Sequence, residues 1–272
     1  MKRFFAAGAI FLCAVCVCVF GYAAYRASVN ARDVFFKLCR EGTPQQIRDA
    51  IKSGADANAR NEKRTTALMA AARDNPDPGA ISALLEGGAD INAQGTDGFT
   101  ALMWSVGNNN PNVASALLNA GADANAPTTE HNFTALMLAT MNRSPEMVSL
   151  LIKKGAKVDY RDKRGFTALM HAVINNDNPE MAARLIESGA DVNAKDKINA
   201  TALLYAAISN KNPEVIRVLL KNGADVNARD NKDMTALAMA VQNNSNPDVI
   251  SALLDAGADV NARTGEGKRA VD

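Results

Sequence analysis

The sequence predicts an all-α solenoid, built from repeated helix–turn–helix units and preceded by one N-terminal hydrophobic helix. Two observations predict the solenoid: sequence markers recur with a period of about 34 residues, and each copy carries an apolar stripe at helical spacing. A third observation, an uncharged run near the start of the chain, predicts the separate helix. With 272 residues, 47% of them hydrophobic, the chain can bury a substantial core.

The first marker is a Thr-Ala-Leu block that recurs in six copies. It begins at Thr66, Thr100, Thr134, Thr167, Thr201 and Thr235. A threonine hydroxyl can accept a hydrogen bond from a free N–H group in the first turn of a helix. We therefore expect the first helix of each repeat to begin here, rich in alanine and narrow enough for neighbouring repeats to stack closely.

The second marker is a proline that is followed ten residues later by a glycine. The prolines are Pro44, Pro78, Pro111, Pro145, Pro179, Pro213 and Pro247. Each follows a Thr, Ser, Asp or Asn, which are good helix N-caps, and proline suits the first helical position because its missing N–H needs no partner. The glycine can adopt the left-handed conformation that closes a helix. We expect the second helix of each repeat between these two markers.

Apolar residues six and seven positions after each proline, such as Leu117 with Leu118, predict the core face of the second helix. The repeat domain is predicted to span residues 33–272. Its units are 33–59, 60–93, 94–126, 127–160, 161–194, 195–228 and 229–262, with an incomplete eighth from 263. The first unit has polar helices typical of a cap, whereas no C-terminal cap follows the seventh. That open side predicts fraying, self-association or a shortened sequence.

These units resemble the ankyrin repeat, whose signature is Thr-Pro-Leu-His-x-Ala. Here residues 167–170 read Thr-Ala-Leu-Met, and residues 223–228 read Gly-Ala-Asp-Val-Asn-Ala, close to the family's hairpin block. The inter-helix loop departs from the family, because Asn-rich runs such as 175–178 replace the usual Gly-His. The resemblance covers residues 33–272. It implies a protein-binding module that uses the hairpin tips and the exposed side of the first helices, which form a concave surface.

The first 32 residues are predicted to direct the chain to a membrane. Lys2 and Arg3 precede an uncharged, mostly apolar run from Phe4 to Tyr25, long enough for a helix that spans a bilayer. This predicts a single-pass anchor with the repeats outside the cytoplasm, in the periplasm. The alternative is a signal peptide cleaved near Ala23, which would release a secreted protein.

The sequence predicts no enzyme, no metal site and no cofactor. Of the two histidines, neither has a Cys or His at ligand spacing, and no phosphate-binding loop is present. The recurring Asp and Asn of the hairpin block fit turn capping better than calcium binding, since the bidentate Glu of a calcium loop is missing. Three of the four cysteines lie in the first 32 residues, so Cys39 is interpreted as a buried apolar residue.

The hairpin tips carry many basic residues, interleaved with Glu62, Asp162, Asp196 and Asp230. A row of mixed charge is usually a solvated edge, and an acidic protein partner is the main alternative. Nucleic acid is not expected, because 30 Lys and Arg against 29 Asp and Glu leave a formal charge of +1.

Residues that vary among the repeats predict where a partner would bind. The position before each threonine and the position four after it escape the repeated pattern, and we expect them to be exposed. The predicted partner-binding residues are Phe99, Trp104, Phe133, Phe166, His171, Tyr205 and Met234. Aromatic anchors often dominate interface energetics. The alternative is that these rings pack between adjacent hairpins and helices.

The sequence therefore predicts a non-enzymatic, monomeric interaction module that is tethered to a membrane or exported. Two other functions stay open: a regulatory or protective subunit of an envelope enzyme, and a structural adaptor that self-associates through its open C-terminal end. The partner is predicted to be a protein.

Overall fold

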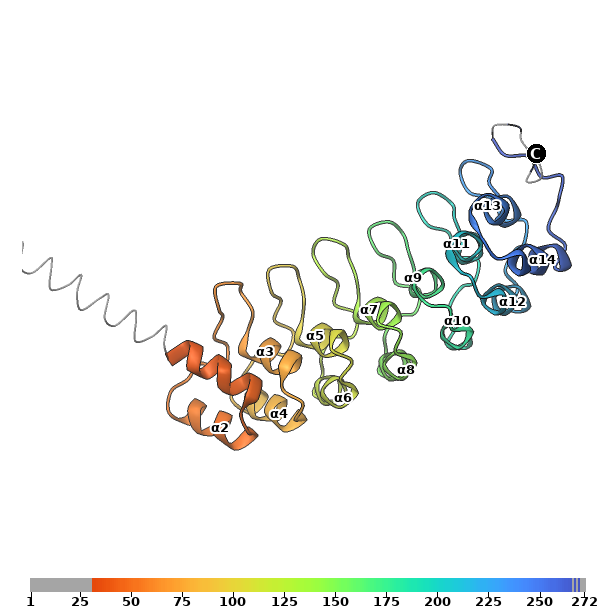
Figure 1. Ribbon diagram of the computed structural model, residues 1–272. Coiled ribbons are helices and arrows are strands. Elements are labelled where there is room, and N and C mark those ends of the chain that lie inside the picture. The colour runs from red at the N-terminus through yellow and green to blue at the C-terminus, as the bar shows by residue number, and fades with distance from the viewer. Residues whose placement is uncertain (1–30, 266, 268, 270–272) are drawn as a thin grey trace, which may run out of the picture. The chain divides into compact units, whose positions relative to one another are not determined.

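The computed structural model describes residues 31–265, 267 and 269 (Figure 1). By its contacts the chain divides into two compact bodies, Met1–Asp90 and Ile91–Asp272. We call them the first and second body. The part of the chain that the structure describes contains helices and isolated β-bridges but no strand, so the predicted all-α class is confirmed. The predicted hydrophobic helix lies outside the described residues. Among those that are described, no helix is long and apolar enough to span a membrane.

The helices alternate between the two predicted kinds. In the first body, residues 31–41 are helical, followed by α2 (Pro44–Lys52), α3 (Ala67–Asp74) and α4 (Pro78–Glu86). The second body has first helices α5 (Ala101–Gly107), α7 (Ala135–Met141), α9 (Ala168–Asn175), α11 (Ala202–Ser209) and α13 (Ala236–Asn243). Its second helices are α6 (Pro111–Asn119), α8 (Pro145–Lys153), α10 (Pro179–Glu187), α12 (Pro213–Lys221) and α14 (Pro247–Asp255). Within this body each first helix packs on the next first helix, and each second helix on the next second helix.

Local capping explains why these helices begin where they do. In five of the six described Thr-Ala-Leu blocks the threonine hydroxyl accepts a hydrogen bond from the third helical N–H; Thr201 is the exception. Every second helix begins at its proline. The glycine that follows each second helix has a positive φ, for example +95° at Gly121, which favours glycine. The predicted start and stop signals are confirmed.

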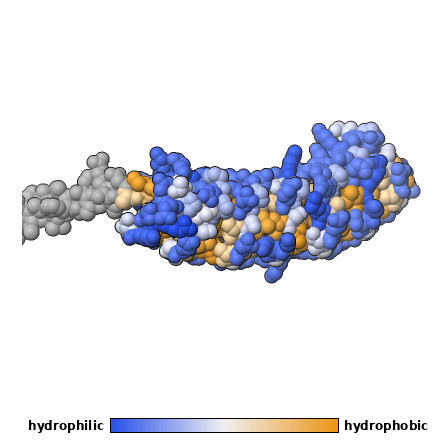
Figure 2. Space-filling view, turned by 90° about the horizontal axis from the view of Figure 1, so that it is seen from below, coloured by the Kyte–Doolittle hydropathy of each residue, from blue (hydrophilic) through white to orange (hydrophobic). Residues whose placement is uncertain are grey.

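The core lies between the two helix layers. In α9, Ala168, Leu169, Met170, Ala172 and Val173 are all at most 1% exposed. The leucine six residues after each proline from Pro78 onward is fully buried, as predicted. The prediction for the next position holds for Leu118, which is 8% exposed, and is wrong for the others: Leu85, Ile152, Ile186 and Leu220 are half-buried and Leu254 is 42% exposed. One residue further around a helix is a turn of about 100°, which moves the side chain from the core to its edge. Figure 2 views the side of the second helices and shows apolar patches there.

Two rows of side-chain amides join successive repeats. In the hairpin blocks, Asn125 donates from Nδ2 to the Gly155 carbonyl at 3.0 Å and accepts at Oδ1 from the Lys157 N–H at 2.7 Å. Asn58 and Asn193 make the same pair of bonds to their following repeats. These bonds agree with the turn-capping interpretation of the Asp and Asn pairs.

The second row occupies the Asn-rich loop between the helices. Asn210 donates from Nδ2 to the carbonyls of Val173, at 2.8 Å, and Asn176, at 3.0 Å, both in the preceding repeat. Its Oδ1 accepts from the Asn212 N–H at 3.0 Å. Asn75 and Asn244 make equivalent bonds. The loop that departs from the usual ankyrin Gly-His is therefore a joint between repeats.

We predict that Asn210→Ala lowers the free energy of unfolding by about 2–4 kcal/mol. The change removes three hydrogen bonds and leaves the Val173 and Asn176 carbonyls without this donor in a buried joint, where Asn210 itself is 1% exposed. Urea unfolding of the full-length chain measures the effect. Asn222→Ala is the matched control, because that exposed amide bonds only within its own repeat. Equal losses of unfolding free energy in both variants would contradict the role of Asn210 as a joint between repeats.

Candidate functional site

The hairpins of repeats five to seven are each organised by a buried aspartate. Asp162 Oδ1 accepts from the N–H groups of Arg164 and Phe166, both at 2.8 Å. Asp196 and Asp230 accept in the same way from the residues two and four positions later. The three aspartates are only 5%, 8% and 8% exposed. They therefore shape the hairpins, as short polar side chains do in turns.

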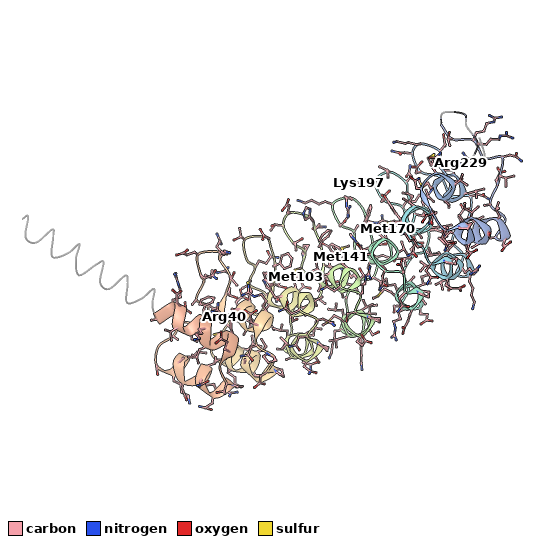
Figure 3. The ribbon with its side chains drawn as sticks, viewed as in Figure 1. Arg40, Met103, Met141, Met170, Lys197 and Arg229 are labelled. Atoms are coloured by element: carbon pink, nitrogen blue, oxygen red, sulfur yellow. The ribbon has the colours of Figure 1, made fainter. Side chains whose placement is uncertain are left out.

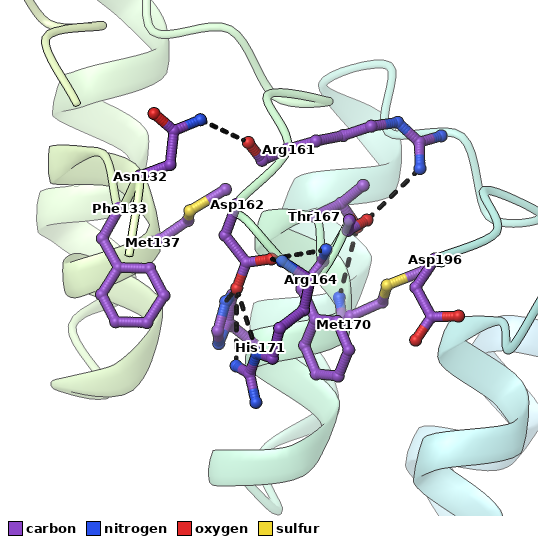
Figure 4. Close-up of polar contacts among 12 residues, drawn as sticks. Asn132, Phe133, Met137, Arg161, Asp162, Arg164, Thr167, Met170, His171 and Asp196 are labelled. Carbon is purple, nitrogen blue, oxygen red and sulfur yellow. Dashed lines mark hydrogen bonds and ion pairs between the residues drawn. The ribbon is translucent and has the colours of Figure 1, made fainter. Parts of the chain in front are cut away.

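Two of these carboxylates also hold the following first helix. Asp162 Oδ2 lies 3.2 Å from His171 Nε2 on α9, and Asp196 Oδ2 accepts a 2.6 Å hydrogen bond from the Tyr205 hydroxyl on α11. Figure 4 shows the Asp162 carboxylate in contact with both His171 and Arg164. Burial lowers the pKa of His171 despite the opposing attraction of Asp162. Burial and the bond to Asp196 raise the pKa of Tyr205 well above its usual value.

Aromatic rings continue from one repeat to the next. The ring centroids are 5.3 Å apart for His131 and Phe133, and 5.3 Å for Phe133 and His171, whose rings meet edge to face. Phe166 lies 5.5 Å from His171 and 4.8 Å from Tyr205. We call these five residues the aromatic row. Their tilted and edge-to-face geometry favours ring–ring attraction across three repeats. Phe99 and Trp104 form a separate pair at 5.4 Å.

The Arg164 guanidinium covers the aromatic row at one point. It lies 4.1 Å from the centroid of the Phe166 ring and 3.4 Å from Asp162 Oδ2. A cation over an aromatic face is attracted by the ring's negative face. The arrangement packs and orients the side chains of the hairpin and of α9.

The described residues contain no group of three or more His, Cys, Asp and Glu that could hold a metal ion. Burial raises the pKa of Cys39 to about 12, so its thiol stays protonated at neutral pH. Cys39 is fully buried, which agrees with its interpretation as an apolar residue. A cavity of about 760 Å³ in the first body is lined largely by apolar residues such as Val34, Phe35 and Leu38.

Comparison with known families decides what this architecture is. The family described as "Ankyrin repeats (3 copies)" matches residues 35–128, 126–196 and 195–264. The chain belongs to the ankyrin-repeat family. Ankyrin repeats indicate a protein–protein interaction module, and the family is typically non-enzymatic. The comparison of this ankyrin chain with curated proteins gives no match.

The predicted partner-binding residues do not share one environment in this ankyrin stack. Phe99, Trp104, Phe133, Tyr205 and Met234 are half-buried. The expectation that all these positions are exposed is wrong for Phe166 and His171, which are 6% and 2% exposed because the neighbouring rings and Asp162 enclose them. For these two residues the structure favours the packing alternative. Binding by the other five stays a prediction.

Sequence reasoning missed the buried aspartates and part of the apolar surface on the first helices. A signal for the aspartates was present, since Asp162 and Asp196 each lie five residues before a Thr-Ala-Leu block and nine before a polar ring. The missed apolar surface consists of Met141, Ile174 and Ile208, which are exposed or half-buried. These three, with Trp104, Leu138 and Tyr205, form what we call the first-helix face.

We predict that acidification destabilises the second body through His171. Its pKa is lower in the folded chain than in the unfolded chain, so the unfolded chain binds the proton more readily. The contribution of neutral His171 to the free energy of unfolding is fully present above the ordinary histidine pKa of about 6.5. It is lost as the pH falls from there through the lower pKa that His171 has in the folded chain.

In His171→Gln the fall in unfolding free energy between about pH 7 and pH 5 should be smaller, because glutamine does not titrate. Urea unfolding of the full-length chain across this range measures it. His131→Gln is the control, since that ring is exposed. A pH dependence unchanged by His171→Gln would contradict the prediction.

Proposed function

We propose that this ankyrin chain is a non-enzymatic protein-binding module whose partner contacts the hairpin tips and the first-helix face, the concave surface of the family. The observation that carries the proposal is the contrast between constant and variable positions. The recurring Thr, Pro, Gly and Asn act as caps and joints in most of the repeats, as at Thr100, Pro111 and Asn125. The residues of the first-helix face differ from repeat to repeat and retain exposed surface.

The first-helix face supplies apolar contact area that the fold does not fully cover. Met141 is 38% exposed at the end of α7, and Trp104 on α5 is half-buried beside Phe99. Large apolar and aromatic side chains that are only partly covered in the free protein gain the most when a partner excludes water from them. Phe133, Tyr205 and Met234 lie at half-buried positions of the same hairpins and helices.

We also propose that the first 32 residues tether the module to a membrane or export it. The uncharged run from Phe4 to Tyr25 supports this proposal, and its length favours an anchor over a cleaved signal. Fractionation of cells that express the full-length chain tests it. Recovery in the membrane fraction supports the anchor, recovery of a shortened chain outside the cells supports cleavage near Ala23, and an intact chain in the cytosol contradicts both.

We predict that Trp104→Ala combined with Met141→Ala weakens partner binding by about 100-fold or more without unfolding the chain. Each anchor contributes roughly 2 kcal/mol at a typical hot spot. Affinity capture with the tagged full-length chain in its native host measures binding, and circular dichroism with urea unfolding measures folding.

Leu254→Ala combined with Val260→Ala is the matched control, because both side chains are 42% exposed and lie outside the first-helix face. A specific protein held by wild type and control but absent from the folded double variant supports the proposal. The same set of proteins with all three chains would place binding on another surface. A captured stoichiometric enzyme would favour the regulatory-subunit alternative, and capture of the chain itself would favour the adaptor.

A further inference from the structure

The hairpins of repeats five to seven separate charges that alternate along the sequence. Residues 161–166, 195–200 and 229–234 mix acidic and basic residues. In the structure Asp162, Asp196 and Asp230 turn inward and accept backbone N–H groups. The basic side chains stay outside: Lys163, Arg164, Lys195, Lys197 and Lys232 are all exposed. We call these five residues the basic tip row. Within the three hairpins, Asp233 is the only exposed carboxylate.

The cations of the basic tip row are available to a ligand to different extents. The ammonium groups of Lys195, Lys197 and Lys232 have no hydrogen-bond or ion-pair partner among the described residues. Lys163 donates to the Thr129 carbonyl at 2.9 Å, which uses one of its three N–H groups. Arg164 shares its charge with Asp162 at 3.4 Å. Within the basic tip row, these three lysines therefore have the charged groups that are least engaged by the rest of the described chain.

Two further arginines, exposed Arg161 and half-buried Arg229, hold adjacent hairpins together. Arg161 donates from Nη1 to the carbonyls of Gly165 and Lys195, and Arg229 donates to those of Asp233 and Arg263. Each bond to the following hairpin crosses from one repeat to the next. Because the acceptors are neutral carbonyls, these bonds fix the guanidinium groups without a carboxylate to cancel their charge. Figure 3 shows Lys197 and Arg229 on the hairpin side of the helices.

We propose that the basic tip row binds an acidic polypeptide segment. The proposal rests on the protein-binding function above and names the chemistry of its partner. A chain of spaced carboxylates matches ammonium groups that successive hairpins present, Lys163 from the first, Lys195 and Lys197 from the second and Lys232 from the third. Ile198, 44% exposed between Lys197 and the end of its hairpin, adds an apolar contact that a peptide side chain can cover.

A polypeptide fits this surface better than a nucleic acid does. Single-stranded nucleic acids gain affinity by stacking bases on open aromatic faces. Here Phe166 is 6% exposed, and its ring is enclosed by Arg164, His171 and Tyr205. The formal charge of +1 for the chain also gives no long-range field to concentrate a polyanion. Local charge and a nearby apolar contact are the features that protein interfaces combine.

The experiment uses the full-length chain in mild detergent and a short fluorescein-labelled peptide of alternating Glu and Ser, followed by fluorescence anisotropy. A Lys and Ser peptide, a dT oligonucleotide and phosphatidylglycerol vesicles are the comparison ligands. The tip variant is Lys195→Glu, Lys197→Glu and Lys232→Glu. The matched control is Lys153→Glu, Lys211→Glu and Lys221→Glu, three exposed lysines on second helices or the loop before them. Both variants change the net charge equally.

We expect the dissociation constants of the Glu and Ser peptide for the wild type and the control to agree within about threefold. The dissociation constant for the tip variant should be at least about tenfold higher. Exposed ion pairs are screened by salt, so binding should also weaken between about 50 and 300 mM salt. Absence of binding at low salt, or equal weakening in both variants, would overturn the proposal. So would preferential binding of the oligonucleotide or the vesicles that depends on the same lysines.

The outcome is separable from that of the protein-binding function. If the peptide does not bind while the wild-type chain still captures a specific protein through the first-helix face, the inference of an acidic partner is wrong and the proposed protein-binding function is retained. If no specific protein is captured and the peptide also fails, both fall.

Discussion

The structure depends on side-chain amides that satisfy backbone groups of the neighbouring repeat. A stack of short helices leaves carbonyl and N–H groups free at every helix end, and these groups are costly to bury without partners. At the hairpin joint Asn125 makes hydrogen bonds to two such backbone groups, and at the loop joint Asn210 makes hydrogen bonds to three. Because both joints recur, each repeat is held by the one before it as well as by apolar packing. Such nearest-neighbour coupling makes a repeat protein cooperative.

Much of the fold could be predicted from the sequence because its signals are local. The cap at Thr167, the proline at Pro179 and the glycine at Gly189 act within a few residues. The sequence alone therefore reveals where each helix begins and ends. The joints could not be predicted, since Asn210 meets carbonyls 34 and 37 residues away. The Asn-rich loop appeared only as a departure from the usual ankyrin sequence.

The candidate site was less predictable for the same reason. Repeat-to-repeat variation marked positions outside the repeated pattern, but variation alone does not separate an exposed ring from one that packs against its neighbours. Phe166 and Phe133 occupy equivalent positions, yet Phe166 is buried between His171 and Tyr205 whereas Phe133 is half-buried. The surrounding side chains decide this, because Arg164 and His171 of the same repeat and Tyr205 of the next enclose Phe166. Met141, Ile174 and Ile208 of the first-helix face were missed, although each lies seven residues after the threonine that opens its block.

The buried aspartates connect the framework to the surface that a partner would meet. Asp196 is drawn inward because its two oxygens have three donors, the N–H groups of Ile198 and Ala200 and the Tyr205 hydroxyl. Lysine has no such option, since an ammonium group cannot accept from backbone N–H groups. Lys195 and Lys197 on either side therefore remain in water. A sequence of alternating sign thus folds into hairpin tips whose exposed charges are positive apart from Asp233, and the turn chemistry that shapes the hairpin also determines the charge that it presents.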